Sequence, residues 1–351
     1  MPLSLRHILR IYLGKCSPQI NKKGSAFLPS NIALCKYWGK RDEKLNLPLN
    51  NSLSLSLGRL GTLTEITVIN ADEDCIILNG QKVSPQSDFF RKITQFCDLF
   101  RQFEKVYFLI ETFNNIPTKA GLASSASGFA ALTLALFRLY SLPEQIETLS
   151  RVARLGSGSA CRSFYRGFCE WICGTDPNGI DSFAIPLKNQ WPDLRIGLLN
   201  IIETEKKIGS REAMEITRHS SPFFTQWNQQ IPVDLAHIKQ AIVDQDFVKL
   251  GEVSENNALK MHATMLTASP SILYWQEETI KGMQRVWNAR QKSIPIYFTL
   301  DAGPNLKLLF THDKEEIIKE NFPEIMVINP LDSPNLRSNK DDFQLGNRYI
   351  T

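Results

Sequence analysis

Three charged residues lie in segments that suit them to chemistry on an anionic substrate: Lys36, Arg162 and Asp301. Asp301 follows a β-like run and precedes an Ala-Gly-Pro-Asn turn, so we expect its carboxylate to project into a cleft. There it could act as a general base, a role that typically contributes about 10²–10⁴ in rate. The alternative is an Asx turn, in which the carboxylate bonds its own loop.

Arg162 lies near the end of a segment rich in glycine and serine, 156–163. Its planar guanidinium matches a carboxylate in bidentate fashion, which the ammonium of a lysine cannot do. The small residues before it can supply backbone N–H groups. A surface arginine paired with an acidic side chain is the common alternative.

Lys36 and Lys40 stand four residues apart, around Tyr37-Trp38-Gly39. The glycine leaves a helix, a turn and an extended segment open. One interpretation places both ammonium groups at an anionic ligand, where they would stabilise its charge. The other is a pair of solvated lysines beside a buried Trp38.

A fourth segment, 117–127, has the composition of a loop that holds phosphate. Its glycine lets backbone approach a ligand, its serines can cap a helix, and the helix start offers free N–H groups. The Gly-Lys-Ser/Thr ending of a Walker loop is absent. An ordinary serine-capped helix with an alanine-rich packing face is the alternative.

Together these segments resemble a known family. Residues 117–126 resemble the phosphate-binding motif of the GHMP kinase superfamily, Pro-x-x-x-Gly-Leu-x-Ser-Ser-Ala. Three further segments resemble motifs of one family in that superfamily, the diphosphomevalonate decarboxylases: 31–42, 156–163 and 298–305. The likeness runs in order from Asn31 to Phe310. It implies ATP- and Mg2+-dependent decarboxylation of mevalonate 5-diphosphate to isopentenyl diphosphate, with release of ADP, phosphate and CO2, in the mevalonate pathway of isoprenoid biosynthesis.

The resemblance also implies a role for each matching residue. Asp301 would contact the 3-hydroxyl, Lys36 would stabilise the transferring phosphoryl group, and Arg162 would hold the substrate carboxylate. Further substrate contacts would come from Tyr37, Trp38, Gly39, Lys40, Ser157, Gly158, Ser159, Ala160, Cys161 and Ser210. The ATP phosphates would lie at Gly121, Leu122, Ala123, Ser124, Ser125, Ala126 and Ser127. No protein ligand for magnesium is assigned, because the nucleotide phosphates and water would hold the ion.

Two departures from the family pattern keep other substrates and activities open. Glu73 stands where relatives often have an arginine that assists the diphosphate, and Arg211 stands where they often have a small hydroxyl residue. A mevalonate monophosphate decarboxylase is therefore an alternative. A GHMP small-molecule kinase without decarboxylation and a catalytically silent ligand-binding sensor are the others. The 36–40 segment together with Arg162 argues against the kinase.

Composition narrows the partners. The chain has 351 residues, 43% hydrophobic, and its 40 Lys+Arg nearly balance 36 Asp+Glu, which argues against a nucleic-acid partner. No apolar run is long enough to span a membrane. Seven scattered cysteines without zinc-site spacing predict reduced thiols in a cytoplasmic protein. A small-molecule substrate is the expected partner, and the resemblance implies a homodimer.

The elements that must position these residues are strands mixed with helices, which predicts an α+β or α/β protein. Strands are predicted over 62–70, 106–112, 196–202, 294–300 and 306–310, with a hairpin over 75–83 that turns at Asn79-Gly80. Helices are predicted over 89–100, from the serine loop to 140, and over 143–155, 233–250 and 271–290. By resemblance, the fold is an α+β GHMP kinase fold. Its N-terminal mixed sheet would carry a left-handed β-α-β unit, its C-terminal domain would be ferredoxin-like, and the active cleft would lie between them.

We expect an N-terminal extension over 1–24, a first domain over 25–190 and a second over 191–351. The extension carries no acidic residue, and its apolar residues share a helical face. It is an amphipathic helix packed on the domain, a product of an early start codon, or a targeting peptide. Two other residues have structural interpretations: His262 as a packed helix histidine, and Asp181 as a loop cap or a magnesium ligand.

Overall fold

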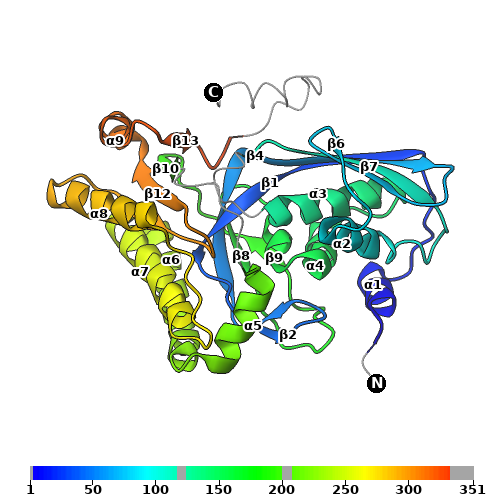
Figure 1. Cartoon of the computed structure of the whole chain (residues 1–351), viewed down its shortest axis with the longest axis horizontal. Helices are drawn as coiled ribbons and strands as arrows, with labels where there is room; N and C mark the ends of the chain where they lie inside the picture. Colours follow the sequence, from blue (N-terminus) through cyan, green and yellow to red (C-terminus); the bar gives the residue numbers. More distant parts are fainter. Residues whose placement is uncertain (1–2, 117–123, 200–207, 333–351) are drawn as a thin grey trace.

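The computed structural model describes residues 3–116, 124–199 and 208–332, and contains two main sheets that lie side by side, each with its own helices (Figure 1). The larger sheet uses strands that end by residue 186, and the smaller one uses strands from residue 194 onward. This arrangement confirms the predicted α+β class.

The larger sheet is mixed. Its order is β6-β5-β7-β4-β8-β9, with β1 paired to β4, and only β5 and β7 run parallel among its described pairs. The β5–β6 hairpin turns at Asn79 and Gly80, whose φ angles of 49° and 80° confirm the predicted turn. The chain passes from β5 to β7 through α2, and the handedness of this crossover stays a prediction. The strands are β1 (Lys23–Cys35), β4 (Ser52–Ile69), β5 (Cys75–Leu78), β6 (Gln81–Lys82), β7 (Tyr107–Asn114), β8 (Phe168–Trp171) and β9 (Ala184–Pro186).

One strand is longer than the sequence predicts, and the strand beside it was not predicted. β4 contains residues 62–69 of the predicted run 62–70 but begins at Ser52, and it pairs along much of its length with β1, for which no strand was predicted. Both faces of β4 are buried from Ser52 to Leu57, because this part lies between the two halves of the molecule. A short separate hairpin, β2 (Lys40–Asp42) and β3 (Leu47–Pro48), follows β1.

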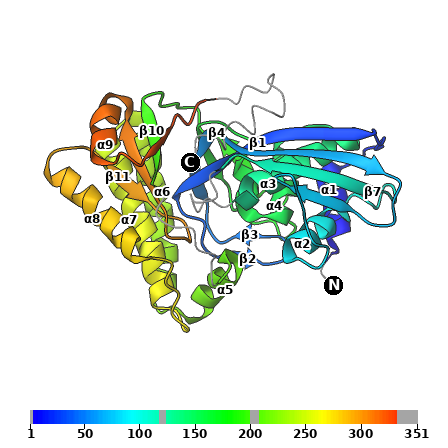
Figure 2. The ribbon, with the colours of Figure 1, turned by 45° about the horizontal axis from the view of Figure 1, so that its top comes forward.

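Helices cover one face of the larger sheet (Figure 2). They are α2 (Asp88–Cys97), α3 (Ser124–Leu139) and α4 (Ile146–Gly156), and with the sheet they enclose a core rich in phenylalanine and leucine. α4 begins three residues after the predicted Pro143. The N-terminal extension forms an amphipathic helix, α1 (Leu5–Leu13), whose Ile8 and Leu9 are buried in the same core.

The smaller sheet has the order β11-β12-β10-β13 and is antiparallel throughout. Its chain order, strand-helices-strand-strand-helix-strand, combined with this spatial order, is the ferredoxin-like arrangement that the resemblance implies. Its strands are β10 (Leu194–Leu199), β11 (Tyr297–Thr299), β12 (Leu306–Thr311) and β13 (Met326–Ile328). Its helices are α5 (Ser210–Ser220), α6 (Phe224–Asp244), α7 (Phe247–Leu266), α8 (Glu277–Gln291) and α9 (Glu315–Asn321).

Three predictions for this half were wrong in their bounds. The single helix predicted over 233–250 is two helices, because Gln245 adopts a left-handed conformation and Asp246 caps α7 through its side chain. α8 begins six residues later than predicted, and α5 was not predicted. Strand β11 covers three residues of the predicted seven.

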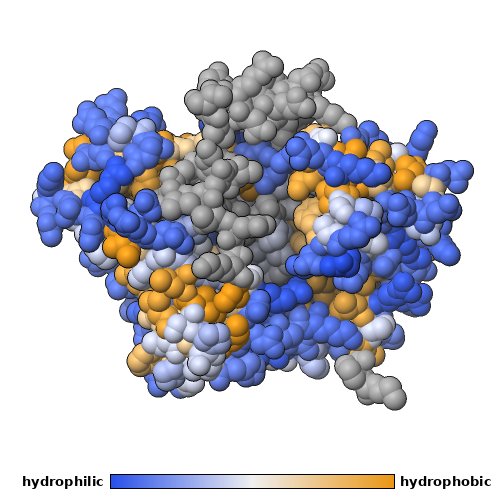
Figure 3. All heavy atoms as spheres, viewed as in Figure 1, coloured by the Kyte–Doolittle hydropathy of each residue, from blue (hydrophilic) through white to orange (hydrophobic). Residues whose placement is uncertain are grey.

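One hydrophobic cluster joins the two halves. It contains Ile32 and Leu55 from β1 and β4 together with Ile238 and Met261 from α6 and α7. The molecular face in Figure 3 is mostly hydrophilic, with apolar side chains gathered near Phe223, where α5 gives way to α6. Within the described ranges, no helix combines the length and apolarity that crossing a bilayer requires.

Candidate active site

A cavity of about 560 Å³ collects residues from both halves of the molecule. It contains the acidic and cationic groups that the sequence singled out, and Arg162 and Asp301 both line it. The predicted residues on its lining are Lys36, Tyr37, Trp38, Lys40, Ser125, Ala126, Ser157, Gly158, Ser159, Arg162, Ser210 and Asp301.

Lys36 and Asp301 form an ion pair at this cavity. Nζ of Lys36 lies 2.9 Å from Oδ1 of Asp301 and donates a second hydrogen bond of 2.6 Å to the carbonyl oxygen of Ala33. The lysine side chain is 2% exposed and the aspartate side chain 33% exposed. Burial lowers the pKa of Lys36, and the carboxylate of Asp301 opposes that shift. The Asp301 carboxylate therefore has an open side toward the cavity and a buried cation against the other.

A second buried lysine, Lys307, was missed by the sequence reasoning. Its side chain is fully buried on β12, and Nζ lies 3.7 Å from Oδ2 of Asp301. Burial lowers the pKa of Lys307, again opposed by the same carboxylate. The available signal was a single lysine within the apolar run 306–310, but the run is apolar on both sides of it and does not show which way the side chain points.

Helix α7 holds the backbone of both Lys36 and Asp301. Oδ1 of Asn257 accepts a 2.8 Å hydrogen bond from the backbone N–H of Lys36. Nε2 of His262 lies 3.0 Å from the carbonyl oxygen of Asp301, and its ring packs at 5.2 Å from that of Trp275. Burial lowers the pKa of His262 to about 3, so the ring is neutral near pH 7 and Nε2–H is the donor. The predicted packed histidine thus also fixes the Asp301 peptide.

Arg162 sits at the end of the 3-10 helix η2 (Gly158–Arg162). Its Nη1 donates a 2.6 Å hydrogen bond to the hydroxyl of Ser52, and its Nε a 3.3 Å bond to Oδ1 of Asn31. Its side chain lies over the ring of Trp171, 5.7 Å from the centroid. These contacts come from β1, β4 and β8, so the sheet fixes the plane of the guanidinium beside the cavity.

Serine hydroxyls gather where α3 begins beside η2. Oγ of Ser157 lies 3.4 Å from the hydroxyls of both Ser125 and Ser159. A side pocket of about 260 Å³ between the sheet, α2 and α3 adjoins this point and shares Lys92, Ser125 and Phe129 with the cavity. Polar donors therefore stand where an apolar recess opens from the main cavity.

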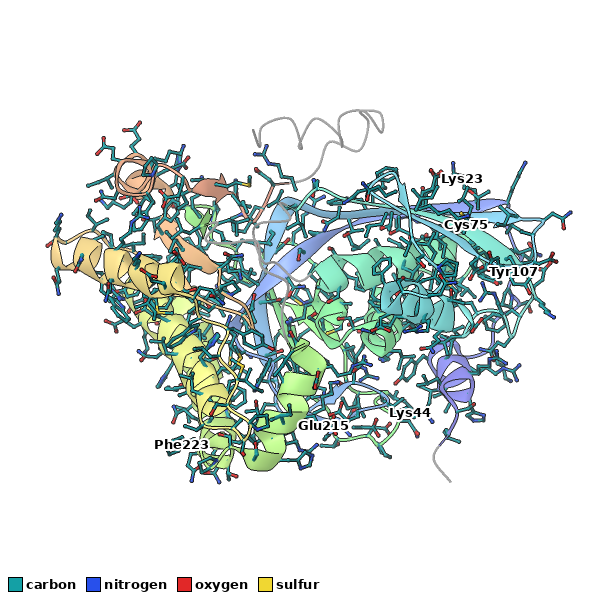
Figure 4. All side chains as sticks on the ribbon, in the orientation of Figure 1. Lys23, Lys44, Cys75, Tyr107, Glu215 and Phe223 are labelled. Atoms are coloured by element: carbon teal, nitrogen blue, oxygen red, sulfur yellow. The ribbon has the colours of Figure 1, made fainter. Side chains whose placement is uncertain are left out.

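The opposite end of the cavity carries further cations on the hairpin β2–β3 and on α5. Lys40 pairs with Glu43 at 2.8 Å, and Arg218 donates to the carbonyl oxygen of Lys40, which ties α5 to the hairpin. Burial lowers the pKa of Lys40, and the positive charge of Arg211 lowers it further. Arg211 lies in the first turn of α5 and lines the cavity. Figure 4 shows Glu215 of α5 beside the hairpin that carries Lys44.

Several predicted residues do not line the cavity. Ala160 and Cys161 are fully buried, and the buried hydroxyl of Ser127 bonds that of Thr62 instead. Gly39 has φ +128° and packs against Phe224, which explains why the chain is neither helical nor a simple strand there. Residues 121–123 lie outside the described residues, as does the side chain of Ser124.

Two residues flagged by the sequence lie elsewhere. Asp181 accepts hydrogen bonds from the backbone N–H groups of Thr175 and Asp176, so it caps its loop, as one of the two predicted roles requires. Glu73 is exposed in the loop before β5 and lies outside the cavity lining. A separate cavity of about 620 Å³ beside α6 has mainly apolar and amide lining, with one charged side chain, Lys239, that pairs with Glu170. Among the described residues that line it, there is no cluster of acidic and basic groups like that of the first cavity.

Family models match both halves of the chain. A model described as diphosphomevalonate decarboxylase-like N-terminal domain covers residues 28–184, and one described as mevalonate 5-diphosphate decarboxylase C-terminal domain covers residues 198–341. A curated diphosphomevalonate decarboxylase from Debaryomyces hansenii is 34% identical over 90% of this chain and 88% of its own.

Solved structures agree with these matches. The crystal structure of mevalonate diphosphate decarboxylase from Staphylococcus aureus is 40% identical, with a TM-score of 0.84, over 89% of this chain and 97% of its own. A structure of MDDEF in complex with MVAPP, AMPPCP and magnesium is 39% identical, with a TM-score of 0.83, over 87% of this chain and 95% of its own. The fold is thus that of the two-domain enzymes the resemblance named, and the chain belongs to the diphosphomevalonate decarboxylase family.

Proposed function

We propose that this protein catalyses ATP-dependent decarboxylation of mevalonate 5-diphosphate to isopentenyl diphosphate, with release of ADP, phosphate and CO2. The observation that carries the proposal is the placement of Asp301, Lys36 and Arg162 around one cavity. Phosphorylation and decarboxylation of a hydroxy acid need three groups. These are a proton acceptor, a buried cation and a guanidinium that binds the carboxylate. Family membership and the relative in complex with MVAPP, AMPPCP and magnesium support it.

The donor set suits a nucleotide with its magnesium ion. Ser125 and the N-terminus of α3 would bind phosphate oxygens, and the adjoining pocket lined by Phe129 would take the nucleoside. Among the described residues Asp301 is the one carboxylate on the lining, and two lysines pair with it, so magnesium would be held mainly by phosphate oxygens and water. When bound, ATP with magnesium supplies the phosphoryl group that turns the tertiary hydroxyl into a leaving group.

The reacting end of the substrate would lie between Asp301 and Arg162. Arg162 would bind the carboxylate, because the guanidinium is already held in one plane by Ser52 and Asn31. Asp301 would accept the proton of the 3-hydroxyl as that oxygen attacks phosphorus. The C–O bond to the new phosphate then breaks, the C–C bond to the carboxylate supplies the electrons of the alkene, and CO2 leaves. Lys36 would stabilise the charge on the transferring group.

The diphosphate end would lie at the cations of the hairpin and α5. Lys40, Tyr37, Ser159 and Ser210 are the proposed contacts from the family pattern. Arg211 would supply the charge that Glu73 cannot, because it lines the cavity whereas Glu73 does not. This placement favours the diphosphate over the monophosphate as substrate, since each charged contact adds to binding of the more anionic compound.

One assay tests the proposal: purified protein with ATP, magnesium and either carboxyl-labelled mevalonate diphosphate or the monophosphate. We expect labelled CO2 and ADP in equal amounts from the diphosphate and far less from the monophosphate. ADP formation without CO2 would assign a kinase, and neither product under any condition would assign a binding protein. A control lacking ATP should release no CO2.

We also propose a cytoplasmic location, a homodimeric assembly and a division of the chain into domains at about residue 190. The cysteines of the described residues are free thiols, which suits a reducing compartment. The domain division is supported by the gap between the two family matches, 28–184 and 198–341. Size-exclusion chromatography with light scattering tests the assembly.

A further inference from the structure

Two ammonium groups flank the Asp301 carboxylate from the protein side. Lys36 contacts Oδ1 at 2.9 Å and lines the cavity, whereas Lys307 lies 3.7 Å from Oδ2 and is fully buried behind it. Lys307 Nζ also donates a 3.1 Å hydrogen bond to the carbonyl oxygen of Asn305, in the turn that follows Asp301. Lys307 thus contacts both the carboxylate and the loop that carries it.

Burying a lysine side chain at position 307 costs folding free energy, which suggests that its charge has a function. A fully buried ammonium loses its hydration, and only an ion pair and hydrogen bonds compensate for that loss. The neighbouring inward residue of β12, Leu309, is fully buried in the hydrophobic cluster that joins the two halves, so an apolar side chain is accommodated on the same face. Packing alone therefore does not account for the charge at 307.

We propose that Lys307 is a positioning residue for the reaction: its ammonium holds Oδ2 of Asp301 and so directs the carboxylate toward the substrate hydroxyl. This inference rests on the proposed function. Asp301 is on a turn and its side chain is one-third exposed, so contacts on both oxygens restrict its rotation more than the Lys36 contact alone. Orientation of the accepting oxygen matters because displacing a reacting group by about 1 Å can cost about 100-fold in rate.

The kinetic test compares Lys307→Met with the wild-type enzyme. Methionine keeps most of the side-chain volume and removes the charge. We expect kcat to fall about 10- to 100-fold, because Asp301 loses its orientation. The KM values for both substrates should change less than about threefold, since Lys307 does not line the cavity. A matched control, Leu309→Ala, alters the same face of β12 and should keep kcat near the wild-type value for the folded fraction.

A stability cycle tests the same contact without any turnover. Asp301→Asn leaves Lys307 and Lys36 without their carboxylate, so thermal unfolding should shift down by several degrees. Adding Lys307→Met to Asp301→Asn should recover part of that loss, whereas adding Leu309→Ala should lower the midpoint further. If Lys307→Met alone does not fold, the double variant still allows the coupling between Lys307 and Asp301 to be measured.

Two results would overturn the proposal: unchanged kcat in Lys307→Met, or additive effects of the two substitutions on unfolding. If the wild-type protein releases no CO2 from mevalonate diphosphate, the proposed function fails instead. The unfolding cycle still decides in that case whether Lys307 and Asp301 are energetically coupled.

Discussion

The Nζ atom of Lys36 lies 2.9 Å from Oδ1 of Asp301, although 265 positions separate the two residues in the chain. Lys36 follows β1 of the larger sheet and Asp301 follows β11 of the smaller one, so this pair closes the cavity across the two halves. Asn257 and His262, both on α7, bond the backbone at either end of the pair. One helix therefore sets the spacing of the two charged residues.

Replacing Asp301 by asparagine should lower kcat for CO2 release by about 10²–10⁴, because the amide cannot accept the hydroxyl proton as a base does. The side-chain shape is retained, so ATP binding, measured by calorimetry, should change little. Asp313→Asn is the matched control, because Asp313 is an exposed aspartate of the same half. An Asp301→Asn enzyme with wild-type turnover would remove the proton acceptor from the mechanism.

Arg162→Lys should weaken the enzyme although it keeps the positive charge. A lysine offers no planar pair of donors for a carboxylate and cannot satisfy Ser52 and Asn31 at once. We expect kcat/KM for mevalonate diphosphate to fall about 10- to 100-fold, in line with loss of about 1.5–3 kcal/mol from a charged hydrogen bond. The exposed neighbour Arg166 provides the control, Arg166→Lys, for which kcat/KM should match the wild type.

The sequence could predict which residues meet at the cavity because they lie in short segments that each resemble a family motif. It could not predict Lys307, since nothing in a strand pattern shows whether a lone lysine points into the interior. Nor could it predict the link from His262 to the carbonyl oxygen of Asp301, which depends on how α7 packs against β11. The end of α6 at Gln245 was missed for a similar reason: helical periodicity continues through the break, and only the Asp246 cap marks it.

The pH dependence of stability should contain a contribution from His262. Burial lowers its pKa from 6.5 to about 3, with Lys36, Lys307 and Asp301 as the charged groups nearby. Between these pH values the unfolded chain binds one more proton than the folded chain, so the free energy of unfolding falls as pH drops below 6.5. The slope from one such group is at most about 1.4 kcal/mol per pH unit.

Urea unfolding of His262→Gln at pH 7 and at pH 5.5 checks this contribution. Glutamine can still donate to the carbonyl oxygen of Asp301 but does not titrate. We expect the variant to lose about 1.2 kcal/mol less than the wild type over this interval. His219→Gln, at an exposed position of α5, should retain the wild-type slope. Equal slopes for His262→Gln and wild type would mean that the ring is not held neutral.

Tyr12 of the N-terminal helix α1 should stabilise the end of α4, next to the 156–163 segment. Its hydroxyl donates a 2.5 Å hydrogen bond to the carbonyl oxygen of Asn178 and accepts one of 2.5 Å from Arg154, a fully buried arginine just before Gly156. Tyr12→Phe removes both bonds, and should cost about 1–3 kcal/mol in the free energy of unfolding, because a buried guanidinium donor loses its acceptor. Tyr107→Phe, at the half-buried first position of β7, is the control, with an expected change below about 0.5 kcal/mol.

Arg211→Ala should change the preference between the two mevalonate phosphates. Arg211 lines the cavity beside Lys40, at the end assigned to the diphosphate. Removing its charge should lower kcat/KM for mevalonate diphosphate about 10- to 100-fold, the range for one charged hydrogen bond. The monophosphate should lose much less, since it lacks the terminal phosphate. Arg59→Ala, an exposed arginine of β4, should leave the ratio of the two kcat/KM values unchanged. An equal loss of kcat/KM for both substrates would mean that Arg211 does not contact the terminal phosphate and that another residue of the cavity does.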